Sequence, residues 1–166
     1  LRIQMMDDEA RPMFDLGSPK LKNYAEEMLR TIGATVAQVP NRVSVAGHTD
    51  SRTYSAGRTE YSNWELSADR ANAARRALAQ RMPRDVKFGR VVGLADSVPY
   101  DREDPFNAAN RRISIVVLNE ATERAIGIRE GLETKAQDLE AAEENAMTKA
   151  EAPDVPRVED PAADPV

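Results

Sequence analysis

Hydrophobic and polar positions follow two different spacings in the first 40 residues. Residues 1–5 alternate between apolar and polar side chains, and this period of two predicts a half-buried strand. Apolar residues then recur at spacings of three and four, which predicts one side of an amphipathic helix: Leu21, Tyr24, Met28, Ile32 and Val36. We expect Ser18 to cap this helix, with Pro19 at its first position and Pro40 ending it.

A second strand and a second helix follow in the middle of the chain. Residues 42–46 form a short apolar run, and residues 47–57 are rich in Gly, Ser, Thr and Asp, as loops are. Ser62 and Glu65 have the spacing of a capping box, so we expect a helix to begin there and to end at Pro83. Its many alanines predict close packing on a sheet.

Two further strands complete the predicted domain. They cover residues 86–94 and 113–118, and a polar loop over residues 99–110 separates them. The second is the most hydrophobic segment, which favours a central place in the sheet. The predicted order is β-α-β-α-β-β, an α+β two-layer sandwich with a mixed sheet and both helices on one face.

The C-terminal part has a different composition and charge. Residues 120–150 are rich in Ala and Glu, and four prolines with acidic residues after position 151 predict disorder. Residues 1–119 hold 18 Lys and Arg against 15 Asp and Glu, whereas residues 120–166 hold 5 against 13. We therefore predict a domain over residues 1–130 and an acidic, helical-to-disordered tail over residues 131–166.

Composition excludes several classes of protein. The acidic balance of −5 does not favour nucleic-acid binding. Without cysteine there is no disulfide or thiolate metal site, and with the single histidine His48 there is no multi-histidine metal centre, so we expect no metal and no cofactor. The sequence has no apolar run that could span a bilayer and no signal segment, and we interpret it as a piece of a longer protein.

Polar residues gather where the second strand ends and the second helix begins. Asp50 follows the strand, Asn63 lies at the helix start, and Arg70 lies two turns further on, so all three are expected at one rim of the sheet. A carboxylate can bind an ammonium group, and a guanidinium can bind a carboxylate in a bidentate manner, so this rim suits a zwitterion. The alternative is an ordinary structural salt bridge between Asp50 and Arg70.

Three ordered motifs resemble the signature of OmpA-like domains. They are Gly47-His-Thr-Asp50, then Asn63-x-x-Leu66-Ser67-x-x-Arg70, then Asn110-Arg111-Arg112-Ile113. This resemblance implies non-covalent peptidoglycan binding, in which Asp50 and Arg70 hold the diaminopimelate of the stem peptide with Asn63 beside them. It implies the same surface for Thr49, Leu66, Ser67 and one arginine of Arg111 and Arg112; which of the two stays open, because a shift of one residue exchanges their faces.

The segment Ser62-Asn-Trp-Glu-Leu-Ser-Ala-Asp-Arg-Ala and the strand from Arg112 are similar to those of MotB-like flagellar stator proteins. That resemblance implies a periplasmic domain of an inner-membrane protein. Its transmembrane helix is not in this chain. The resemblance also implies a homodimer and a MotA-like stator partner. The dimer interface could be the Ala-rich helix or an exposed sheet edge.

Two other functions compete with stator anchoring. One is the wall anchor of an outer-membrane protein or a lipoprotein. The other is a wall hydrolase that uses His48 and Asp50, but no nucleophile with a convergent base is evident in the sequence. We therefore expect a binding domain and not an enzyme.

Overall fold

The computed structural model describes residues 1–53, 61–82 and 88–127. The elements are β1 (Arg2–Met6), α1 (Asn23–Val36), β2 (Val43–Gly47), α2 (Asn63–Ala79), β3 (Phe88–Gly93), the 3-10 turn η2 (Ala108–Asn110), β4 (Arg112–Val117) and α3 (Glu120–Ala125). All belong to one compact unit, Leu1–Ala125. The tail expected over residues 131–166 lies outside the described residues, and the boundary near residue 130 stays a prediction.

The four strands form one mixed sheet in the order β1-β4-β2-β3. β4 is antiparallel to both β1 and β2, while β2 and β3 are parallel. The mixed sheet and the central place of the most hydrophobic strand, both predicted from the sequence, are therefore confirmed. Met6 pairs with Arg112 and Gly47 pairs with Ile113, so the ends of β1 and β2 meet the start of β4 at one rim.

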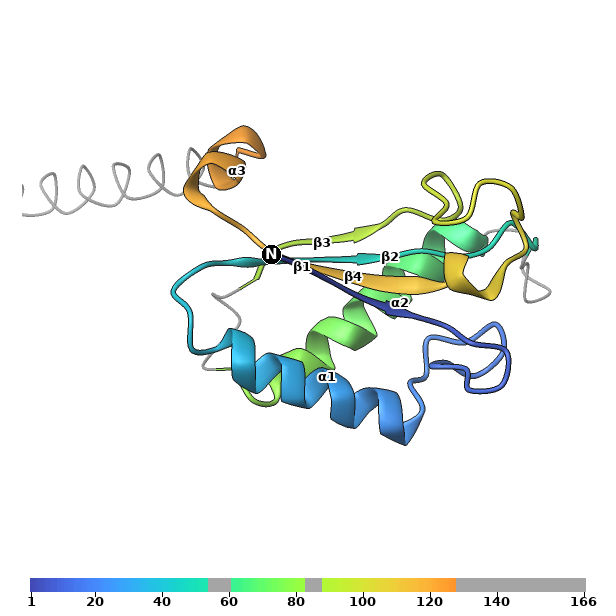
Figure 1. Ribbon diagram of the computed structural model, residues 1–166, viewed down its shortest axis with the longest axis horizontal. Helices are drawn as coiled ribbons and strands as arrows, with labels where there is room; N and C mark the ends of the chain where they lie inside the picture. The colour runs from blue at the N-terminus through green and yellow to red at the C-terminus, as the bar shows by residue number, and fades with distance from the viewer. Residues whose placement is uncertain (54–60, 83–87, 128–166) are drawn as a thin grey trace, which may run out of the picture. The chain divides into compact units, whose positions relative to one another are not determined.

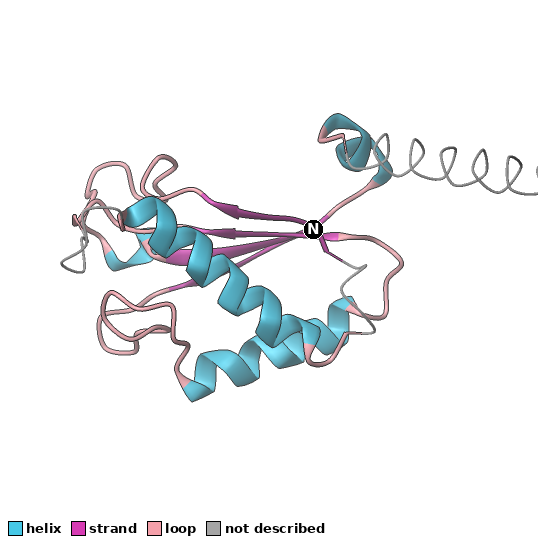
Figure 2. Cartoon of the chain, turned by 180° about the vertical axis from the view of Figure 1, so that it is seen from behind, coloured by secondary structure: helices cyan, strands magenta, loops and turns pink. Residues whose placement is uncertain are grey.

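Both long helices cover the same face of the sheet, as predicted (Figure 1; Figure 2 shows it from behind). α2 packs on β2 and β3, and α1 packs on α2. Gly47 and Gly93 make the close approach of α2 possible, since a Cβ at Gly47 would lie 2.1 Å from the Ser67 carbonyl oxygen and one at Gly93 would lie 2.6 Å from the Ala68 nitrogen. The first turns of α2 are thereby fixed at the rim. The largest fully buried apolar side chains are aliphatic: Leu29, Val43, Val45, Leu78, Ile113 and Ile115.

The two helices begin differently. In α2 the Ser62 hydroxyl accepts from the Trp64 N–H, and Glu65 accepts from the Ser62 N–H at 2.8 Å, so the predicted capping box is confirmed. The prediction of a Ser18 cap for α1 is wrong. α1 begins at Asn23 after Lys22, whose side chain makes no capping bond, because residues 13–22 turn back on themselves through a bridge between Phe14 and Leu21.

The buried side of α1 is also rotated relative to the predicted stripe. Ala25, Leu29, Gly33 and Val36 are buried, whereas Met28 is exposed. The small residues decide the packing here, because they let α2 approach, and a pattern of large apolar side chains does not identify them. Among the described residues, no helix is long and apolar enough to cross a membrane.

Candidate functional site

A pocket of about 560 Å³ lies at the rim where β1 and β2 end and α2 begins. Its wall has three parts: the segment after β1, the loop after β2 with the first turns of α2, and the residue before β4. The lining residues are Asp7, Glu9, Pro12, Phe14, Asp15, Leu16, Gly17, Lys22, Thr49, Asp50, Arg52, Thr53, Asn63, Leu66, Arg70 and Arg111. The volume is in the range of small-molecule sites.

The structure brings most of the expected site residues together. Six of them line the pocket: Thr49, Asp50, Asn63, Leu66, Arg70 and Arg111. Ser67 and Arg112 do not. Ser67 is fully buried behind the pocket, where its hydroxyl donates to the Trp64 carbonyl and accepts from the Ala95 N–H at 3.0 Å. It therefore holds α2 to the segment after β3.

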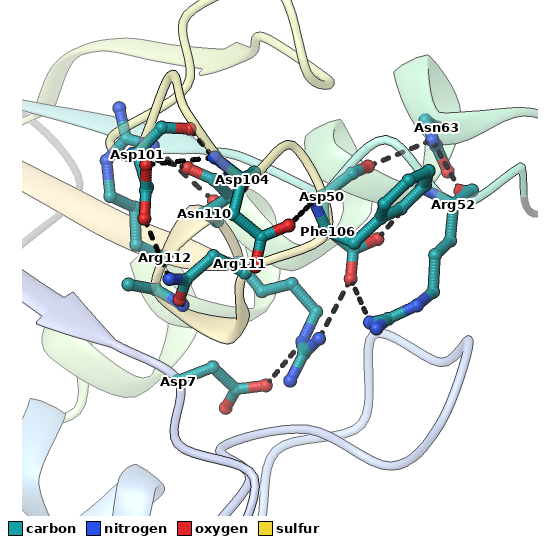
Figure 3. Close-up of polar contacts among 12 residues, drawn as sticks. Asp7, Asp50, Arg52, Asn63, Asp101, Asp104, Phe106, Asn110, Arg111 and Arg112 are labelled. Atoms are coloured by element: carbon teal, nitrogen blue, oxygen red, sulfur yellow. Dashed lines mark hydrogen bonds and ion pairs between the residues drawn. The ribbon is translucent and has the colours of Figure 1, made fainter.

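Arg111 joins two carboxylates at the bottom of the site (Figure 3). Its Nε donates to Asp7 Oδ2 at 2.8 Å, and its Nη1 donates to Asp50 Oδ2 at 2.8 Å. Burial opposes the charge of Arg111, but the hydrogen bonds that it donates to Asp7 and Asp50 outweigh burial and raise the pKa of this guanidinium. Asp7 is further fixed because its other oxygen accepts from the Met13 N–H. Asp7, Arg111 and Asp50 thus form a rigid array in the pocket in which each charge has a partner of opposite sign.

Arg70 is in a different situation in the same pocket. Its Nε donates to the Ser18 carbonyl at 3.1 Å, and its guanidinium lies 4.8 Å from the centre of the Phe14 ring. It is buried, and burial lowers its pKa despite the nearby carboxylates. Within the described part of the chain it forms no ion pair. The structural salt bridge between Asp50 and Arg70 that the sequence allowed is thus not formed there, and Asp50 pairs with Arg52 and Arg111 instead.

Asn63 holds the loop that carries Asp50. Its Nδ2 donates to the Arg52 carbonyl at 2.9 Å and to the Asp50 carbonyl at 3.3 Å (Figure 3). The N–H of Arg52 in turn donates to Asp50 Oδ1 at 3.2 Å. Asp50 is therefore presented by a loop that is fixed from the first turn of α2.

The polar loop before β4 supports the same loop from the other side. Asn110 is buried, its Oδ1 accepts from the N–H groups of Tyr100 and Asp101, and its Nδ2 donates to two carbonyls (Figure 3). This network fixes the loop, and its Pro105 carbonyl accepts from the Ser51 N–H at 3.0 Å. The asparagine of the third motif thus acts on the site through the backbone.

Arg112 lies on the opposite side of the sheet from the pocket. Along β4 it alternates with Ile113, which is in the core under the helices. Its guanidinium donates to the Val98 carbonyl at 2.9 Å, and with it lies His48, whose pKa is lowered to about 4 by burial and then by Arg112 and Arg2. His48 does not line the pocket.

The negative and positive side chains that line the pocket are equal in number. The lining contains four carboxylates, Asp7, Glu9, Asp15 and Asp50, and four cations, Lys22, Arg52, Arg70 and Arg111. A balanced set suits a zwitterion better than a polyanion. Among the described residues, no cluster of three His, Asp or Glu side chains could hold a metal ion.

Sequence reasoning missed the contribution of the N-terminal segment and of Arg52. Asp7 meets Arg111 because β1 pairs with β4, and this pairing is not visible in the sequence. The choice between Arg111 and Arg112 had a usable signal, however. Residues 111, 113 and 115 share one face of the strand, and the two isoleucines mark that face as the one that packs in the hydrophobic core.

A mixed sheet with two helices on one face and a pocket at its rim is the architecture to compare with known families. The OmpA family model matches residues 13–114, and the chain belongs to the OmpA family.

Individual relatives place the chain more finely within that family. It is 45% identical to Motility protein B of Escherichia coli (strain K12) over 143 residues, which is 86% of this chain and 46% of that protein. The chain thus spans about half the length of this relative.

Two solved structures share the fold. The cell wall anchor of the type VI secretion system (T6SS) from Pseudomonas aeruginosa is 27% identical, with a TM-score of 0.58 over 72% of this chain and 81% of that one. The periplasmic domain of Helicobacter pylori MotB (residues 97–256) is 18% identical, with a TM-score of 0.60 over 81% of this chain and 92% of that one. The second likeness concerns the fold alone.

Proposed function

We propose that this domain binds peptidoglycan without catalysis and anchors a flagellar stator to the cell wall. The observation that carries the proposal is the contrast inside the pocket between Asp50, held on a rigid array, and Arg70, a buried guanidinium without a carboxylate partner among the described residues. Together they offer an acceptor for an ammonium group and a donor for a carboxylate.

The ligand that fits is the free end of diaminopimelate in a stem peptide, which carries one ammonium and one carboxylate. The carboxylate would pair with Arg70, and the ammonium would bind at Asp50. Thr49, Asn63, Leu66 and Arg111 complete the wall of the pocket. Ser67 and Arg112 then support the site without touching the ligand.

Membership of the OmpA family and the likeness to Motility protein B support the stator as the machine that is anchored. On this proposal the domain lies in the periplasm, the whole protein is held in the inner membrane, and it works as a homodimer with a MotA-like subunit. The alternative is the anchor of an outer-membrane protein or lipoprotein. If the gene encodes a transmembrane helix with an aspartate before Leu1, this would support the stator proposal. A lipobox encoded there would contradict it.

Co-sedimentation with purified sacculi tests the binding site. Asp50→Ala and Arg70→Ala should each reduce the bound fraction at least about tenfold, since each removes one charge-assisted contact. Arg81→Ala is the matched control, because Arg81 is an exposed arginine that pairs with Glu27 away from the pocket. Unchanged binding of both pocket variants would refute the site.

The non-catalytic part of the proposal has its own test. The domain should release no soluble fragments from labelled sacculi. His48 is buried outside the pocket and has a low pKa, so it is badly placed for general-base chemistry there. Release of labelled fragments above a buffer control would contradict the proposal.

A further inference from the structure

Asp50 carries two guanidinium groups on one oxygen. Arg111 Nη1 lies 2.8 Å and Arg52 Nη1 lies 2.7 Å from Asp50 Oδ2 (Figure 3). The Asp50 side chain is only 7% exposed. Its Oδ2 is therefore already occupied by cations of the protein itself before any ligand arrives.

The two arginines are held very differently. The Arg111 side chain is 20% exposed and is fixed at its other edge by Asp7. The Arg52 side chain is 55% exposed, and besides its ion pair with Asp50 its guanidinium lies 5.8 Å from the centre of the Phe106 ring. Exposed ion pairs are weak because water competes for both partners. Arg52 can therefore leave Asp50 easily, whereas Arg111 cannot.

The backbone of Arg52 stays in place when its side chain moves. Asn63 holds the Arg52 carbonyl, and the N–H of Arg52 is bonded to Asp50 Oδ1. The Arg52 guanidinium therefore remains within reach of Asp50 whether or not the two groups are paired.

We propose that Arg52 is a built-in competitor for the ammonium group of the ligand. This inference rests on the proposed function. In the free protein the Arg52 guanidinium occupies the Asp50 carboxylate, and a ligand must bring its own ammonium to displace it. The exchange of one cation for another keeps the pocket balanced, so a ligand with a carboxylate but no ammonium gains nothing at Asp50. Arg52 therefore lowers the affinity of the pocket for every ligand that brings an ammonium group to Asp50.

The opposite role for Arg52 is also testable. If it clamped a carboxylate of the ligand, its removal would weaken binding. If it competes, its removal strengthens binding, because the fraction of free protein that can accept the ligand rises. The sign of the change separates the two roles.

The experiment compares Arg52→Gln with Arg81→Gln and wild type in calorimetric titration with a stem tripeptide ending in meso-diaminopimelate. Arg81 is the matched control, since its side chain is 52% exposed and forms an ion pair with Glu27 outside the pocket. Arg52→Gln should bind about two- to fivefold more tightly than wild type, as the loss of a weak competing pair predicts. Arg81→Gln should bind like wild type.

An affinity of Arg52→Gln that equals that of Arg81→Gln, or falls below it, would overturn the competitor role. Asp50→Asn in the same titration separates this failure from a failure of the proposed function. If Asp50→Asn loses binding and Arg52→Gln gains none, only the competitor role of Arg52 is refuted, and the proposed binding site stands. If Asp50→Asn binds with wild-type affinity, both the proposed binding site and the competitor role of Arg52 are refuted.

Discussion

Two neighbouring arginines at the start of β4 lie in opposite kinds of surroundings. On the pocket side, Arg111 is paired with Asp7 and Asp50. On the other side of the sheet, Arg112 donates to backbone carbonyls, and its Nε and His48 Nδ1 are buried without a hydrogen-bond partner among the described residues. Burial, followed by Arg2, lowers the pKa of Arg112. On the pocket side the charges are therefore paired, whereas on the other side Arg112 forms no ion pair with a described residue.

The difference shows which arginines hold the fold and which one remains for a ligand. A buried carboxylate that loses its cation is costly, because its charge is then uncompensated. A buried cation bonded only to carbonyls or to a ring leaves no opposite charge behind when it is removed. Arg111 belongs to the first kind, and Arg70 and Arg112 belong to the second.

The largest effect on stability should come from Arg111→Gln. It leaves the carboxylates of Asp7 and Asp50 without their shared cation, and it should lower the free energy of unfolding by about 3 kcal/mol. Arg112→Gln is the neighbouring control and should lower it by only about 1 kcal/mol. Urea denaturation at pH 7 measures both. Equal losses would contradict the contrast between the two sides.

A smaller effect should appear on the His48 side as a pH dependence. The unfolded chain takes up a proton at His48 near pH 6.5, whereas the folded protein does so only at a pKa of about 4. The unfolded state therefore binds more protons in this window, and acidification from pH 6.5 to 4 should destabilise the fold by up to about 2 kcal/mol. His48→Asn should remove this part of the pH dependence in urea titrations, and an unchanged slope would contradict the prediction.

The smallest stability effect should come from Arg70→Gln. Arg70 has a carbonyl and the Phe14 ring as partners, so its loss leaves no carboxylate uncompensated. We expect the free energy of unfolding to change by less than about 1 kcal/mol while binding to sacculi is lost. A destabilisation as large as that of Arg111→Gln would show that Arg70 is structural.

The sequence predicts the parts of this molecule that depend on local chemistry. The alternation in residues 1–5, the capping box at Ser62 and the hydrophobic run at residues 113–118 all correspond to elements in the structure. These features depend on neighbours within a few positions, so periodicity and capping rules identify them.

The parts that depend on long-range pairing were not predictable in the same way. Ser18 resembles a helix cap, but the turn between Phe14 and Leu21 delays the helix to Asn23. Asp7 reaches Arg111 only through the pairing of β1 with β4. The motifs placed Asp50 and Arg70 in one pocket but gave no sign that Asp50 already holds cations.

The most direct test of the account follows the arginine side chains themselves. In a titration of the domain with a stem tripeptide ending in meso-diaminopimelate, the Nε–Hε resonance of each arginine can be recorded by NMR. We predict that the Arg70 resonance shifts with ligand concentration and saturates, while that of Arg112 stays unchanged. A ligand that binds without moving the Arg70 resonance, or that moves the Arg112 resonance instead, would contradict the proposal that Arg70 binds the carboxylate of the ligand.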